Sequence, residues 1–176
     1  WSENSEDIYF AALAEGIQGI FVAEGPSAEA VENLTNAAAK KLAPWKVERL
    51  TADDLWYDFG SPFHVAEAEN GIKTLYTTWC SMDFPTEFVA VTVPADGMAA
   101  ASDCKQITME NEHLLSQLTP HETEARMVRT VDGKDMLTWV LYPPQFDASK
   151  EYPAILICLG GPQGTLSQGW SYRWNY

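Results

Sequence analysis

The chain has 176 residues, of which 46% are hydrophobic and 12% are aromatic, so it can bury a core in one domain or in parts of two. Its 25 acidic residues outnumber its 11 basic residues, for a net charge of -14. This balance argues against a nucleic-acid partner, because phosphate binding requires clustered Lys and Arg. No apolar stretch reaches the roughly 20 residues of a membrane helix, so we expect no membrane span.

The first residues, Trp1-Ser2-Glu3-Asn4, contain neither an initiator Met nor the apolar region of a signal peptide. We therefore expect a longer precursor, with any targeting signal upstream of Trp1.

Residues 1–118 are predicted to form strands and turns. Short β-rich runs at 7–10 and 20–23 flank a glycine-containing turn and predict a hairpin, and strand character returns at 46–51. The Ala-rich stretch 28–41 is compatible with a helix or with a long surface insertion running from about Gly25 to Trp45.

A weak internal repeat follows, with a period of about 60 residues. Residues 74–76 begin a strand, 88–93 provide its partner, and 105–108 correspond to 48–51. Repeated units of antiparallel strands are typical of propeller blades. Since a propeller needs several blades, part of it would lie outside this sequence.

The pattern changes near residue 118. Residues 126–129 and 136–142 predict a second hairpin with its turn at Asp132-Gly133. A proline-rich link then leads to the apolar run 154–158, predicted to be a buried strand with Cys158 as a small buried hydrophobe. This order resembles the opening of an α/β-hydrolase sheet. Finding 154–158 exposed and unpaired would contradict this domain interpretation.

Gly160 and Gly161 end the apolar run and are the candidate catalytic residues. In acyl transfer, backbone N–H groups stabilise the developing oxyanion, and glycine lets the backbone approach the substrate closely. The Gly161 N–H is the preferred donor. The alternative is that Gly160-Gly161-Pro162 only forms a tight turn.

Two aromatic residues further on, Trp170 and Tyr172, are candidates for a substrate-pocket wall, although core packing is the commoner role for such residues. A carboxylate at a cavity rim would pair with a substrate ammonium group. The sequence offers several carboxylates for this role without favouring one: Glu15, Asp53, Asp54, Glu67 and Glu69.

No catalytic triad is predicted within the chain. The nucleophile motif G-x-S-x-G is absent from the sequence. Ser167 and Ser171 could be combined with a histidine, but the α/β-hydrolase order is Ser, then Asp or Glu, then His, after the oxyanion loop. We therefore expect the three histidines to have other roles: His64, His113 and His121.

The cysteines are widely spaced, with no C-x-x-C pair and no metal-ligand spacing to the histidines. We predict no metal site and no cofactor. The odd number leaves at least one cysteine free or paired outside the chain.

Several ordered pieces resemble the prolyl oligopeptidase family of serine peptidases, most closely its bacterial dipeptidyl-peptidase V and acylaminoacyl-peptidase branches. The stretch from 136 to 176 is the most specific. The pieces are residues 1–4, 8–10, 81–88, 105–108 with Asn111, 131–133, 139–144, 152–153, 160–163 and 170–175.

This resemblance implies a mixed fold. Residues 1–118 would be the C-terminal antiparallel blades of a β-propeller. Residues 119–176 would be the first strands of an α/β-hydrolase domain, ending before the nucleophile. One departure is Leu159, which stands where the family's oxyanion motif has His. A hole built from backbone N–H groups can survive that change.

The resemblance also implies a function. The parent protein would hydrolyse short peptides near a free amino terminus through a Ser-His-Asp triad, in the periplasm or outside the cell. Its partners would be the peptide substrate, the remainder of the same polypeptide and, in a homodimer, a second copy. The 176 residues alone would be inactive.

Two alternatives stay open. One is an acylaminoacyl-peptidase or oligopeptidase of the same family. The other is a non-catalytic propeller that acts as a binding module.

Overall fold

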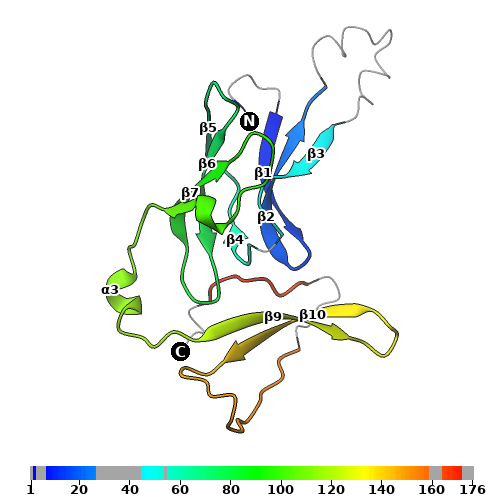
Figure 1. The fold of residues 1–176 in the computed structure, drawn as a ribbon, viewed down its shortest axis with the longest axis vertical. Helices are drawn as coiled ribbons and strands as arrows, with labels where there is room; N and C mark the ends of the chain where they lie inside the picture. The colour runs from blue at the N-terminus through cyan, green and yellow to red at the C-terminus, as the bar shows by residue number, and fades with distance from the viewer. Residues whose placement is uncertain (1, 3–6, 27–44, 54, 159–163, 172–176) are drawn as a thin grey trace.

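A computed structural model describes residues 2, 7–26, 45–53, 55–158 and 164–171 (Figure 1). Within these residues the chain is mostly antiparallel β-strand with very little helix, as expected. The strands are β1 (Asp7–Ala14), β2 (Ile17–Glu24), β3 (Lys46–Arg49), β4 (Asp58–Phe59), β5 (His64–Glu67), β6 (Lys73–Cys80), β7 (Glu87–Val93), β8 (Cys104–Gln106), β9 (Glu122–Arg129) and β10 (Asp135–Tyr142). The helical turns are η1 (Ala101–Asp103) and α3 (Glu112–Leu115), which the sequence analysis did not predict.

The first sheet confirms the predicted N-terminal hairpin. Its strand order is β1-β2-β3, and β1 pairs with β2 along the whole length of both strands. The connecting residues Glu15 and Gly16 both have positive φ, 52° and 89°, which is the conformation of the two-residue turns that match strand twist. The insertion predicted between about Gly25 and Trp45 lies mostly outside the described residues.

The second sheet contains the second predicted strand pair. Its order is β4-β6-β7-β8, with β5 also pairing with β6. Leu75 lies opposite Val91 in the register of β6 and β7, so the predicted pairing is confirmed. Successive antiparallel partners β6-β7-β8 repeat the order β1-β2-β3, in agreement with the internal repeat.

One hydrophobic core joins the two sheets. Strand β7 alternates buried and exposed positions, as expected for a strand with one face in a core. Fully buried side chains from both sheets meet in this core, including Ile20 and Val22 from β2 and Leu75, Val89 and Val91 from β6 and β7. Each such side chain stabilises the fold by about 1.5–3 kcal/mol.

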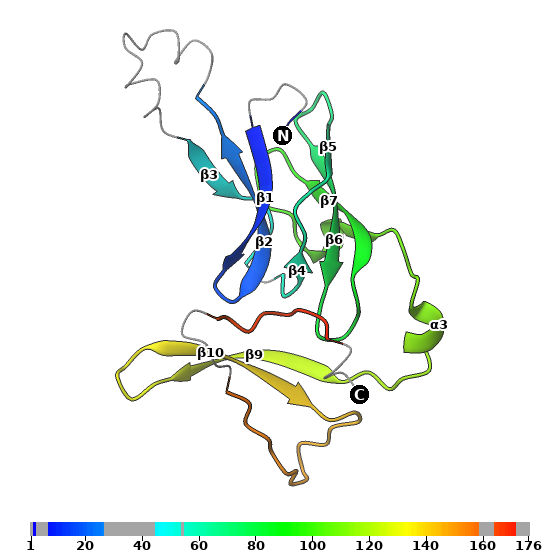
Figure 2. The same ribbon diagram turned by 180° about the vertical axis from the view of Figure 1, so that it is seen from behind.

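A separate hairpin follows the short helix α3. Strands β9 and β10 pair with each other only, and Gly133 in their turn has φ 80°, which confirms the predicted Asp132-Gly133 turn. Figures 1 and 2 show this hairpin below the other two sheets, with residues 164–171 (red) running between them.

The prediction of a buried strand at 154–158 is wrong for this structure. Residues 151–158 form no strand, and Ile155, Leu156 and Ile157 are 76–89% exposed. Cys158 is also exposed rather than buried. Apolar composition predicts burial only when neighbouring strands supply hydrogen bonds and a cover, and no described strand pairs with this run. The domain interpretation predicts a buried and paired strand here, so an exposed and unpaired run counts against it. The hydrolase assignment of 119–176 remains a proposal.

The described residues include no helix with the length and apolar character needed to cross a membrane.

Candidate functional site

Most of the predicted site residues lie outside the part of the chain that the structure describes. Gly160, Gly161 and Tyr172 lie outside the described residues, so the predicted oxyanion role is not tested. Trp170 is described and is half-buried. In this region the structure describes residues 164–171, which follow the glycines.

Segment 164–171 contacts both the hairpin and the β-sheets. On the hairpin side, the Trp139 Nε1–H donates a hydrogen bond to the Leu166 carbonyl oxygen, with 2.8 Å between the atoms. On the sheet side, the Ser167 hydroxyl donates to the Asp58 carboxylate at 2.6 Å. The two contacts involve neighbouring residues of the segment, which is thus held from both sides.

Gln168 makes a further connection to the second sheet. Its side chain is 3% exposed, and its Oε1 accepts a hydrogen bond from the Met82 backbone N–H at 3.2 Å. Burying an amide is costly unless it is hydrogen-bonded, so this hydrogen bond stabilises Gln168 in its buried position.

Trp170 of the segment contacts Cys80 at the end of β6 through its backbone. Burial raises the pKa of the Cys80 thiol, and a hydrogen bond from the Trp170 backbone acts in the opposite direction. The thiol is therefore protonated at neutral pH and suits a packing role better than a nucleophilic role.

A cavity of about 220 Å³ adjoins the segment. Its polar lining residues come from the loop after β6, from β9 and from segment 164–171. Its aromatic lining residues come from the loop before β4. The lining residues are Leu55, Trp56, Tyr57, Ser81, Asp83, Ala101, Thr123 and Gln168. Trp56 also packs edge-on against Trp139 of the hairpin, with 5.6 Å between ring centroids.

Two residues that line this cavity, Ser81 and Asp83, and the nearby His121 have the types of a catalytic triad but not its geometry. His121 Nε2 lies 3.0 Å from Asp83 Oδ1, and the Ser81 hydroxyl lies 3.4 Å from Asp83 Oδ2. The carboxylate thus stands between the serine and the imidazole. In a working triad the imidazole stands between them, because it must take the serine proton.

The serines and histidines considered in the sequence have other surroundings. Ser167 donates to a carboxylate, where a triad would require an imidazole acceptor. His64 packs against Tyr76 at 5.6 Å between ring centroids, and His113 is exposed on α3. Ser171 is half-buried at the edge of the described chain.

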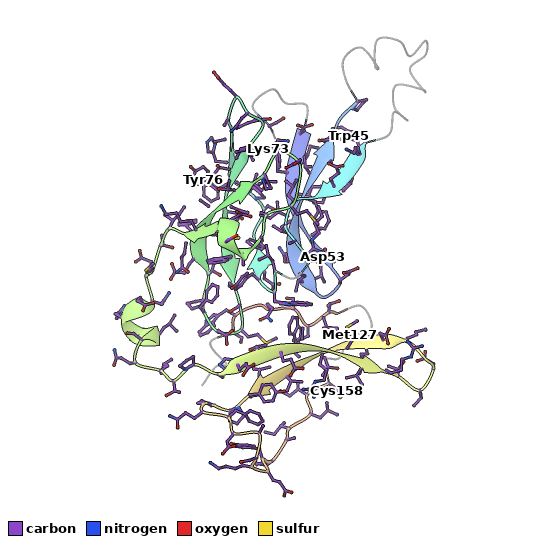
Figure 3. All side chains as sticks on the ribbon, viewed as in Figure 1. Trp45, Asp53, Lys73, Tyr76, Met127 and Cys158 are labelled. Atoms are coloured by element: carbon purple, nitrogen blue, oxygen red, sulfur yellow. The ribbon has the colours of Figure 1, made fainter. Side chains whose placement is uncertain are left out.

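The described members of the carboxylates considered for a substrate amino terminus do not line the cavity. Glu15 is exposed in the β1–β2 turn, and Glu67 and Glu69 are exposed around the end of β5. Asp53 is exposed and forms an ion pair with Arg49. Asp54 lies outside the described residues. Figure 3 shows Asp53 near the lower end of the first sheet.

Asp58 and Gln168 are the site residues that the sequence analysis missed. No local motif marks either one. Ser167 and Asp58 are 109 positions apart in the chain, so their contact emerges only when the fold brings the two segments together.

Searching the described residues for metal ligands gives no group of three or more His, Cys, Asp or Glu side chains in a suitable arrangement.

Comparison with known proteins gives a consistent result. The chain is 50% identical to dipeptidyl-peptidase 5 of Porphyromonas gingivalis over 176 residues, covering 99% of this chain and 21% of that protein. It is 50% identical to dipeptidyl-peptidase 5 of Porphyromonas endodontalis over 102 residues, which are 58% of this chain and 14% of that protein. With dipeptidyl-peptidase 5 of Schizosaccharomyces pombe it shares 38% identity over 58 residues, which are 33% of this chain and 8% of that protein.

This chain thus spans about a fifth of the length of the Porphyromonas gingivalis relative. No protein-family model matches it. The identity along nearly the whole chain supports a dipeptidyl-peptidase family.

Proposed function

We propose that this chain is part of a serine exopeptidase of the dipeptidyl-peptidase type. The observation that carries the proposal is the 50% identity to a dipeptidyl-peptidase 5 over 99% of the chain. This identity extends over two differently organised parts, the β1–β8 sheets and the β9–β10 hairpin. It supports the same arrangement of both parts in this chain and in that relative.

The proposed architecture has two domains. Residues 1–118 belong to the last blades of a β-propeller, and residues 119–176 begin an α/β-hydrolase domain of the prolyl oligopeptidase type. The two packed antiparallel sheets and their repeated strand order support the first assignment. The second rests on the family resemblance and on the β9–β10 hairpin.

On this proposal, the exposed run at Ile155, Leu156 and Ile157 acquires its neighbours from the rest of a longer polypeptide. Three consecutive apolar side chains at 76–89% exposure favour pairing or burial against other chain segments. That remainder also supplies the catalytic serine, aspartate and histidine.

The proposed reaction is hydrolysis of a peptide bond near a free amino terminus. The Gly161 N–H stabilises the tetrahedral oxyanion, with Gly160 giving the backbone room to approach. Trp170 and Tyr172 line the substrate pocket. The proposed location is the periplasm or the cell exterior, in accordance with the family resemblance.

The test compares two polypeptides with a chromogenic dipeptidyl substrate. We expect the full-length protein to release the chromophore and to react with a serine-directed fluorophosphonate. The 176-residue chain, purified alone, should do neither. Turnover by the short chain would contradict the assignment of the nucleophile to the remainder, and an inactive full-length protein would favour the non-catalytic binding module.

A further inference from the structure

Segment 164–171 lies between the β9–β10 hairpin and the two β-sheets (Figures 1 and 2). Its Leu166 carbonyl oxygen accepts a hydrogen bond from the indole N–H of Trp139 on β10, with 2.8 Å between the atoms. The next residue, Ser167, donates its hydroxyl to the Asp58 carboxylate of β4 at 2.6 Å. Two adjacent residues therefore bond the segment to the hairpin on one side and to the β-sheets on the other.

The Asp58 carboxylate is itself held by both β-sheets. Asp58 lies opposite Cys80 in the pairing of β4 with β6. Its Oδ1 accepts a hydrogen bond from the Gln18 backbone N–H of β2 at 3.2 Å, and its Oδ2 accepts from Ser167. A hydrogen bond from a hydroxyl to an ionised carboxylate is about twice as strong as a neutral one. The sheet end of the contact is thus a fixed and charged acceptor.

Gln168 adds a second attachment to the sheets. Its side chain is buried, and its Oε1 accepts a hydrogen bond from the Met82 backbone N–H at 3.2 Å. Met82 follows β6, and Asp58 pairs with the end of the same strand. Both attachments therefore lie at one end of the second sheet.

The position of the hairpin depends on side-chain contacts of this kind. Within the described residues β9 and β10 pair with each other only, so no described backbone ladder joins them to either sheet. A two-stranded hairpin alone is marginally stable in water. Other described contacts across the junction join Trp139 to Trp56, Leu137 to Gly16 and His121 to Asp83.

We propose that residues 166–168 form a strap that couples the hairpin to the β-sheets, so that the contact at Trp139 and the contact at Asp58 stabilise each other. Holding Ser167 restricts the backbone of Leu166, the residue before it. Because ordering a residue has an entropic cost, the second contact forms at a smaller cost once the first is in place. The coupling goes beyond the proposed function and holds whether or not the protein is a peptidase.

The test measures amide hydrogen exchange by mass spectrometry in the full-length protein and its variants. Ser167→Ala removes the hydroxyl at the sheet end of the strap. Trp139→Phe removes the indole N–H at the hairpin end and keeps an aromatic ring beside Trp56, and a double variant combines both changes. Ser149→Ala is the matched control, because it also deletes a hydroxyl bonded to a carboxylate, that of Asp147 at 2.7 Å, but within an exposed local turn.

Each single substitution should make exchange in residues 164–171 about tenfold faster, because a local restraint is lost. If the contacts are coupled, the loss of one already weakens the other, so the double variant should also be only about tenfold faster than wild type. Ser167→Ala should in addition speed exchange in β10, where Trp139 lies. Ser149→Ala should change neither region, and exchange in the core strands β6 and β7 should stay slow in every variant.

The other results would overturn the proposal. A double variant that exchanges about a hundredfold faster, the product of the single effects, means that the two contacts are independent. Unchanged exchange in Ser167→Ala means that the Asp58 contact does not hold the segment, and unchanged exchange in β10 means that it does not reach the hairpin. An equal effect of Ser149→Ala, or faster exchange in β6 and β7, would assign the change to a general loss of stability.

Discussion

Glu87 provides a sharp test of how the second sheet is held together, because it is a carboxylate with 4% exposure at the start of β7. Its Oε2 accepts a hydrogen bond from the Thr108 hydroxyl. Its Oε1 accepts from the backbone and side-chain nitrogens of Asn111, each at 3.4 Å. One buried charge thus holds the loop that leads from β8 to α3.

Replacing Glu87 with Gln keeps the shape and removes the charge. Hydrogen bonds to charged groups contribute about 1.5–3 kcal/mol, and the amide nitrogen replaces one of two acceptor oxygens. We therefore expect Glu87→Gln to lower the free energy of unfolding by about 1.5–3 kcal/mol at neutral pH. The control Glu110→Gln removes an exposed carboxylate nearby and should have an effect within about 0.5 kcal/mol.

The effect of Glu87 should also depend on pH in a defined direction. Burial alone would raise the pKa of this carboxyl, but hydrogen bonds from Thr108, Glu110 and Asn111 bring its pKa below the ordinary value of 4.5. The unfolded chain then binds more protons near that pH. The stabilisation is fully present above about 4.5 and is lost as the pH falls through the lower folded-state pKa.

Urea denaturation of the wild type and both variants between pH 3 and pH 7 measures this dependence. The difference between wild type and Glu87→Gln should shrink at acid pH. A difference that grows as the pH falls, or a variant as stable as wild type at pH 7, would refute the reasoning.

Three further predictions concern the core, a turn and a thiol. Leu75→Ala truncates a fully buried core side chain and should lower the free energy of unfolding, measured by urea denaturation, by about 2–5 kcal/mol. Leu118 is 64% exposed, so Leu118→Ala should lower it little. Equal effects of the two substitutions would contradict the described core. Gly133→Ala should cost about 1–2 kcal/mol in the same assay, because Gly133 has φ 80°; an unchanged stability would rule out this turn conformation. Burial and the nearby Asp103 charge raise the pKa of Cys104 to about 11. Mass spectrometry after brief iodoacetamide treatment at pH 8 should therefore show the exposed Cys158 alkylated before Cys104. The reverse order would contradict the burial of the Cys104 thiol.

The hairpins were predictable from the sequence because they depend on neighbours in the chain. At β9–β10, the runs 126–129 and 136–142 on either side of the Asp132-Gly133 pair predict both the strands and the turn. The pairing of β6 with β7 was likewise readable from two β-rich runs at a short separation.

Other features depend on distant segments and could not be predicted. The apolar run at 155–157 gives the same sequence signal with or without neighbouring strands, and its exposure shows that composition alone does not determine burial. Asp58 also has no distinguishing motif, since its role depends on Ser167, 109 positions away. Glu87 would be assigned to the surface by its charge, and hydrogen bonds from Thr108, Glu110 and Asn111 make its burial acceptable.

Product analysis provides the most direct test of the central claim that this chain belongs to a dipeptidyl peptidase. The full-length protein would be incubated with one short peptide in two forms, with a free and with an acetylated amino terminus, and the products identified by mass spectrometry. We expect dipeptides from the free form and no cleavage of the acetylated form. Release of an acetylated amino acid would contradict the claim in favour of an acylaminoacyl-peptidase, and no product from either form would contradict peptidase activity.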